Sequence, residues 1–148
     1  MTNAGTTDMV PVTIAGVATA PDKGPGRRER FFITLASAAE GDSRRLFIGV
    51  GDAEATALAF GLQGQEFPRP MTYQLMASLV AAAGSGVRSV RVTRRADDIF
   101  YAQVTLRGGA VVDARPSDAI NLAAVTGAPI LVASGLLDLP TDPRLRVR

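Results

Sequence analysis

Three stretches of the chain combine residue types that can bind or hydrolyse a phosphate ester. The sharpest runs from Asp113 to Asp118 and places Arg115 and Ser117 between two carboxylates, where a predicted strand meets a predicted helix. Arginine binds phosphate oxygens in pairs, a hydroxyl donates to them, and carboxylates hold hard cations. A helix cap braced by an Arg–Asp pair accounts for the same residues without any catalytic role, so both interpretations stay open.

The other two stretches adjoin the starts of predicted helices. Pro68 and Pro70 hold Arg69 in an extended loop that leads to Thr72, and a fixed guanidinium beside a helix N-terminus can bind an anion. Glu54 lies in the first turn of another predicted helix. A carboxylate at that place favours the helix dipole even when it has no further role. The structural alternatives are therefore a proline-rich connector and a dipole-stabilising acid.

Composition removes several reaction classes. The chain has no histidine and no cysteine, which excludes an imidazole general base, thiolate catalysis, disulfides and the common zinc sites. Its single lysine, Lys23, does not follow the glycine pattern of a P-loop. Any chemistry must come from carboxylates, arginines and hydroxyls, with or without an oxygen-ligated metal.

Length and hydropathy predict one folded domain. The 148 residues are 47% hydrophobic and 20% charged with a net charge of +2, so the chain can bury a core without a metal or disulfide. We expect a flexible N-terminus at residues 1–9, a single domain at 10–139 and a flexible tail at 140–148. The polar start lacks the apolar core of a signal peptide, and Gly and Pro interrupt the uncharged stretch 119–137. These features predict a cytoplasmic protein with no membrane span.

The hydrophobic period alternates between strand-like and helix-like along the chain. We expect strands at residues 10–19, 30–36, 46–50, 87–94, 99–107, 110–114 and 129–133, and helices at 53–62, 72–83 and 116–126. The predicted helix caps are Asp52, Thr72 and either Ser117 or Asp118. This order predicts an α+β fold: a single domain with a mixed, mostly antiparallel sheet and about three helices.

Four arginines, Arg88, Arg91, Arg94 and Arg95, form the densest basic group of the sequence. Strict alternation along a strand places Arg88 and Arg94 on one face and the other two on the opposite face. The four then form no continuous track for phosphates unless a bulge intervenes. We interpret them as charges that protect a solvated edge strand.

From about residue 45 to residue 140 the sequence resembles the bifunctional nuclease domain family, whose members are described as having DNase and RNase activity. The matching segments, in family order and spacing, are Ile48-Gly-Val-Gly-Asp-Ala-Glu-Ala55, Pro68-Arg-Pro-Met-Thr72, Phe100-Tyr-Ala102, Asp113-Ala-Arg-Pro-Ser-Asp-Ala-Ile120 and Ala128-Pro-Ile130. The resemblance implies an α+β fold, a homodimer with a groove, and a site at Glu54, Arg69, Thr72, Asp113, Arg115, Ser117 and Asp118.

The chain departs from the family at one place. The family usually continues Pro-Arg-Pro-x-Thr with His-Asp, whereas this chain has Tyr73-Gln74. If that histidine transfers a proton, this chain is catalytically impaired. If it only packs or forms a hydrogen bond, Tyr73 can replace it.

We therefore predict a nuclease that hydrolyses DNA and RNA backbones with low sequence specificity. Glu54, Asp113 and Asp118 are the predicted catalytic residues and would hold Mg²⁺ or Mn²⁺, which would activate water. The predicted phosphate-binding residues are Arg69, Thr72, Arg115 and Ser117.

Two alternatives remain at this level. One is a catalytically impaired anion-binding, nucleotide-binding or regulatory module of the same fold. The other is a dimerisation module in which the pairs Arg69–Glu54 and Arg115–Asp118 only brace the fold. The nuclease and the anion-binding module require that residues far apart in the sequence meet around one open cavity. The dimerisation module does not require such a cavity.

Overall fold

A single mixed sheet forms the centre of the computed structural model, which describes residues 8–21, 25–26 and 28–147. The sheet has eight strands in the order β3-β2-β1-β7-β4-β5-β6, with the short β8 paired to β1. The pair β4–β7 is parallel, and the other pairings are antiparallel. The strands are β1 (Met9–Pro21), β2 (Glu29–Ser37), β3 (Arg45–Val50), β4 (Val87–Ala96), β5 (Ile99–Leu106), β6 (Val111–Ala114), β7 (Ile130–Ala133) and β8 (Arg146–Val147).

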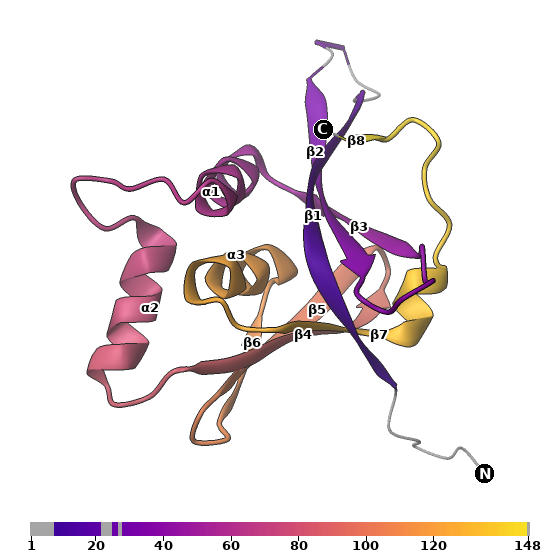
Figure 1. The fold of residues 1–148 in the computed structure, drawn as a ribbon. Helices are drawn as coiled ribbons and strands as arrows, with labels where there is room; N and C mark the ends of the chain where they lie inside the picture. The colour runs from indigo at the N-terminus through magenta and orange to yellow at the C-terminus, as the bar shows by residue number, and fades with distance from the viewer. Residues whose placement is uncertain (1–7, 22–24, 27, 148) are drawn as a thin grey trace.

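Three α-helices complete the α+β fold and confirm the predicted class. They are α1 (Asp52–Leu62), α2 (Thr72–Ala82) and α3 (Pro116–Thr126), and a 3₁₀ helix η1 (Ser134–Asp138) follows β7. Helix α3 packs on β4 and β5 and contacts both other helices, with α1 and α2 flanking it in Figure 1. Within the described ranges, no helix has the length and hydropathy needed to cross a membrane.

Strand β7 joins two halves of the sheet. The first half is the meander β1–β2–β3 and the second is β4–β5–β6 (Figure 1). Val132 of β7 pairs with Val10 on one side and with Val92 on the other. Val92 and Val132 are fully buried, because alternate residues of an interior strand face the helices. The core therefore lies between α3 and the middle of the sheet.

Some sequence predictions need correction at helix starts. The caps are Gly51, Met71 and Arg115, and no cap makes a side-chain hydrogen bond. The predicted caps lie one to three residues later, inside the first turns. For α3 the predicted start at Pro116 is confirmed, because the fixed φ of proline suits the first helical position, and the cap is therefore Arg115.

The sequence prediction was also wrong about the position of β4 in the sheet. It pairs with β7 on one side and β5 on the other, so it is an interior strand and not a solvated edge. Of the predicted flexible ends, residues 1–7 and 148 lie outside the described residues, and β1 begins at Met9. Near the other end, Arg146 pairs with Thr19 of β1.

Candidate active site

The turn from β6 into α3 brings Arg115 and Asp118 together. Arg115 caps the helix in an extended conformation, so its side chain can reach the carboxylate three residues later, in the first turn. Its Nε donates to Oδ2 of Asp118 at 2.8 Å and its Nη2 donates to Oδ1 at 3.1 Å. This two-point geometry fixes the plane of the guanidinium.

Glu54 of α1 contacts the same guanidinium. Nη2 of Arg115 donates to Oε1 of Glu54 at 3.3 Å. The helices are held in register by Asn121, whose Nδ2 donates to the backbone oxygen of Glu54 at 3.2 Å and to that of Ser117 at 2.9 Å. Because Asn121 is buried, these two hydrogen bonds from its side-chain amide hold the first turn of α1 against α3.

Tyr73 completes the group from α2. Its phenol donates a hydrogen bond to Oδ1 of Asp118 at 2.8 Å. Burial raises the pKa of Tyr73, and the hydrogen bond to Asp118 adds to the rise. The hydrogen bonds from Arg115 lower the pKa of Asp118. At neutral pH the phenol is therefore neutral and the carboxylate ionised. We call Glu54, Tyr73, Arg115 and Asp118 the Arg115 cluster.

The Arg115 guanidinium keeps donors free for a ligand. A guanidinium has five N–H groups, and the contacts to Glu54 and Asp118 use Nε and Nη2. The two N–H groups of Nη1 are thus left for another acceptor within the described structure. The Arg115 side chain is 66% exposed, so solvent or a ligand can reach it.

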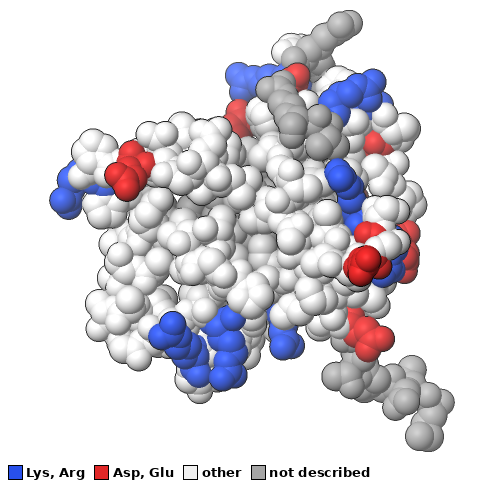
Figure 2. Space-filling view, in the orientation of Figure 1, with Lys and Arg blue, Asp and Glu red and all other residues white. Residues whose placement is uncertain are grey.

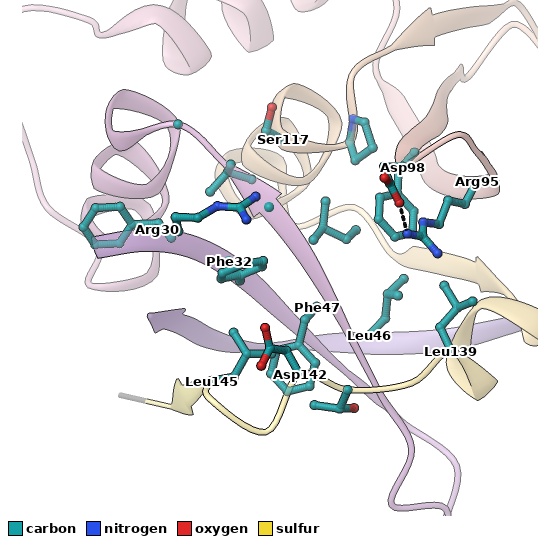
Figure 3. A pocket seen from close by; sticks show the side chains of 18 of the residues that line it. Arg30, Phe32, Leu46, Phe47, Arg95, Asp98, Ser117, Leu139, Asp142 and Leu145 are labelled. Carbon is teal, nitrogen blue, oxygen red and sulfur yellow. Dashed lines mark hydrogen bonds and ion pairs between the residues drawn. The ribbon is translucent and has the colours of Figure 1, made fainter. Parts of the chain in front are cut away.

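A cavity of about 930 Å³ opens beside the cluster (Figure 3). The N-terminal ends of two helices lie on its wall: Gly51 and Asp52 at the start of α1, and Arg115 and Ser117 at the start of α3. Ser117 is only 8% exposed. Helix N-termini carry unpaired N–H groups and partial positive charge, so both favour an anion here.

Arginines from several strands give the cavity further positive charge. Arg30 of β2 lies over the Phe32 ring at 5.4 Å, and both line the cavity with Ser117 in Figure 3. Part of the charge is neutralised by Glu29, Asp52, Asp98 and Asp142, which also line it. The arginines on the wall are Arg28, Arg30, Arg45, Arg95 and Arg115.

The structure brings together only part of the predicted site. Glu54, Arg115 and Asp118 meet in one cluster, and Ser117 lies beside them on the cavity wall. Arg69 and Thr72 are exposed, and neither is bonded to the cluster in the described part of the chain. The expected Arg69–Glu54 pair is not formed, because Glu54 pairs with Arg115. The expected Arg115–Asp118 pair is confirmed.

Asp113 lies on the other face of the sheet. On β6, Ala114 pairs with the fully buried Ala102, whereas Asp113 pairs with Gln103. Adjacent strand residues point to opposite faces, so the Asp113 side chain points away from α3 and from the cluster.

The carboxylates present do not fit a divalent cation as they stand. Among the described residues, no three acidic side chains are grouped so that they could hold a metal. Glu54 and Asp118 already share the guanidinium of Arg115, which offsets one of the two negative charges that would attract Mg²⁺ or Mn²⁺.

Asn121 and Arg30 are among the residues of this region that sequence reasoning missed. Asn121 is a lone amide in the apolar run of α3, and a buried polar residue in such a run is a signal for a structural hydrogen bond. Arg30 carries no such local signal, because its place on the cavity wall depends on the pairing of β2 with β3.

Known proteins match this chain over much of its length. The family model described as the bifunctional nuclease domain matches residues 34–141. An uncharacterized protein of Mycobacterium tuberculosis is 39% identical over 105 residues, which cover 71% of this chain and 63% of that protein. Bifunctional nuclease 1 of Arabidopsis thaliana is 35% identical over 99 residues, 63% of this chain and 30% of the plant protein. Bifunctional nuclease 1 of Oryza sativa subsp. japonica is 30% identical over the same length.

Proposed function

This chain belongs to the bifunctional nuclease domain family, and on that premise we propose that it hydrolyses phosphodiester bonds of DNA and RNA with low sequence specificity. Family membership supports a nuclease-type function in general. The substrates and the residue roles below are our proposal, since the match spans 63% of the mycobacterial relative and 30% of the Arabidopsis nuclease.

One observation carries the proposal. Arg115 is held by two carboxylates from different helices, yet it is exposed at the rim of a cavity wide enough for a nucleotide. The two carboxylates orient the guanidinium, and the free Nη1 would bind a non-bridging oxygen of the phosphate. Ser117 and the N–H groups of the α3 first turn would add donors on the same side.

Catalysis would then rest on placement and charge. As water attacks phosphorus and loses a proton to solvent, the P–O bond to the leaving oxygen breaks and that oxygen takes a proton from solvent. Arg115 would stabilise the negative charge that grows on the phosphate oxygens. Glu54 is our candidate for orienting that water. The Glu54 carboxylate lies next to the cavity wall. Its Oε2 is 2.5 Å from the position that a Cβ on Gly51 would occupy, and Gly51 lines the cavity. Contacts to the backbone alone carry no sequence information, in agreement with low specificity.

The test is cleavage of plasmid DNA and of a structured RNA by the purified chain. We expect Arg115→Gln to slow cleavage by about 100-fold, since one donor to the developing charge is lost. The matched control is Arg44→Gln, which removes another two-point Arg–Asp pair, with Asp42, away from the cavity. Equal activity of the two variants, or none in the wild-type chain with Mg²⁺ or Mn²⁺, would reject the proposal.

A second candidate, an anion-binding or nucleotide-binding module, is favoured by the pKa values of Tyr73 and Asp118, both of which move away from neutral pH. A general base works best with a pKa near the working pH, whereas the pKa of Tyr73 is raised and that of Asp118 is lowered. A module of this kind would be stabilised by phosphate or nucleotides through Arg115 without turnover. Thermal unfolding of the wild-type chain and Arg115→Gln, with and without a nucleotide, distinguishes this function from hydrolysis.

We also propose a homodimer in the cytoplasm. Met71, Leu75 and Leu79 are 52%, 50% and 60% exposed. Because they are four residues apart along α2, they form one apolar stripe on its outer face. A second copy of the chain would remove this stripe from water.

A further inference from the structure

Strand β4 contains two irregularities in its pairing with β5. Val87 pairs with Leu106 and Ser89 with Thr105, which leaves Arg88 as an extra residue. A second shift after Val92 leaves Thr93 as an extra residue. An extra residue on one strand is a β-bulge, and it interrupts the alternation of side chains between the two faces.

The first bulge turns Arg88 outward. Val87 packs against the core and Val90 is fully buried in it, although the two are three residues apart rather than two or four. The residues between them, Arg88 and Ser89, therefore both lie off the core face. Arg91 follows Val90 by regular alternation and faces outward as well.

The second bulge has the same effect on Arg94. This residue pairs with Tyr101, whose neighbour Ala102 is fully buried on the core face. Tyr101 and its partner Arg94 therefore face outward, and Arg95 pairs with Phe100 toward the cavity. The expectation that Arg91 faces away from Arg88 and Arg94 is wrong, and the two bulges are the reason.

Arg88, Arg91 and Arg94 thus form a single row, which we call the β4 arginine track. All three are exposed, and none makes an ion pair within the ranges that the structure describes. Figure 2 shows basic side chains along the lower edge of the molecule, where β4 runs in Figure 1. Because of the two bulges the row runs alongside residues 101–105 of β5, so it extends over roughly 15 Å at 3.3 Å per residue.

The face beside the track can also contact bases. The Arg94 guanidinium lies 3.7 Å from the centre of the Tyr101 ring, so the pair forms a flat, charged surface. Bases of unpaired strands stack on aromatic rings and on guanidinium planes. Gln103 and Thr105 share this face through their pairing with Arg91 and Ser89, and the Asp113 carboxylate shares it through its pairing with Gln103.

We propose that the β4 arginine track, with Tyr101 beside it, binds the backbone of single-stranded nucleic acid at a surface separate from the Arg115 cluster. Unpaired arginines in a row match the charge of a polyphosphate chain, and the stacked pair favours exposed bases over a duplex. The inference rests on the proposed function only in taking nucleic acid as the ligand.

Binding is measured by fluorescence anisotropy with labelled 20-nucleotide strands, one of DNA and one of RNA, over a range of salt concentrations. We expect Arg91→Gln/Arg94→Gln to weaken binding about tenfold at 100 mM salt and to flatten the plot of log K against log salt by about 1.4, since each lost contact removes about 0.7 for a single strand. The matched control, Arg144→Gln/Arg146→Gln, removes two exposed arginines elsewhere and should bind like wild type.

Three outcomes would overturn the track: equal losses in both double variants, no loss in either, or a blunt duplex binding as tightly as the single strands. A small diester, bis-p-nitrophenyl phosphate, tests the proposed function separately from the track. It is too small to contact both surfaces at once, so its hydrolysis depends on the Arg115 cluster alone. A track variant should hydrolyse this diester at the wild-type rate. A wild-type chain that binds strands through the track but hydrolyses no diester would reject the nuclease and keep the track.

Discussion

The phenol of Tyr73 donates a 2.8 Å hydrogen bond to Oδ1 of Asp118 and thereby links α2 to the first turn of α3 across 45 positions of sequence. Tyr73→Phe keeps the ring and removes this donor to a partly buried carboxylate. We expect a loss of about 1.5 kcal/mol in the free energy of unfolding, measured by urea denaturation. Tyr101→Phe is the matched control, because its hydroxyl makes no hydrogen bond in the described structure. Equal effects of the two substitutions would contradict this role of Tyr73.

Asp118 predicts an acid-dependent part of the stability. Because Arg115 lowers its folded-state pKa, the contribution of Asp118 is complete above the unfolded pKa of roughly 3.9 and disappears as the pH falls through the lower folded value. Unfolding free energies measured between pH 7 and pH 2 should therefore decline more steeply for wild type than for Asp118→Asn. Parallel curves would show that the carboxylate gains nothing from Arg115 in the folded state.

Gly51 offers a way to move the Glu54 carboxylate without changing it. A Cβ at this position would stand 2.5 Å from Oε2 of Glu54, so Gly51→Ala should displace the carboxylate while the backbone stays in an allowed conformation. We expect cleavage to fall nearly as far as in Glu54→Gln, with a change in stability under about 1 kcal/mol. The control is Gly61→Ala in the same helix, where the nearest contact is an ordinary 3.8 Å. Full activity of Gly51→Ala would count against a role for Glu54.

The metal requirement stays a prediction from the sequence, and Arg115 provides a test of it. The guanidinium occupies the place between Glu54 and Asp118 where a cation would be attracted. Arg115→Gln leaves two uncompensated carboxylates, so we expect it to bind Mn²⁺ more tightly than wild type in isothermal titration calorimetry. The gain should vanish in Glu54→Gln/Arg115→Gln. Equal or tighter binding by wild type would contradict this expectation.

The homodimer is tested at the apolar stripe of α2. Leu75→Glu/Leu79→Glu places two charges on a surface that is half exposed in the single chain. We expect sedimentation equilibrium at micromolar concentration to give a dimer for wild type and a monomer for this variant, with little change in the helix content. A monomeric wild-type chain would remove the dimer from the proposal.

Much of the fold was predictable because local patterns decide it. The apolar alternation near Val90 and Val92 predicted a strand, and Gly127, in a left-handed conformation, ends α3 as expected. The helix caps were placed late, because Asp52 and Thr72 suit a cap and a first turn almost equally well. Local sequence does not distinguish these neighbouring positions.

The site was less predictable because its contacts are not local. The Arg115–Asp118 pair spans three residues and was expected, whereas Arg115–Glu54 spans 61 residues and depends on how α1 packs against α3. The direction of Arg88 depends on a bulge, which exists only relative to the partner strand. Pairing register is therefore the information that the residues alone did not supply.

Strand β7 has a consequence for how the chain is made. The strand that joins β1 to β4 begins at Ile130 and therefore leaves the ribosome after both of its partners. Until then the two meanders can form separately, but the inner edges of β1 and β4 stay unpaired and open to other chains. A nascent or truncated chain that stops before β7 should consequently be the species that chaperones retain and that aggregates first.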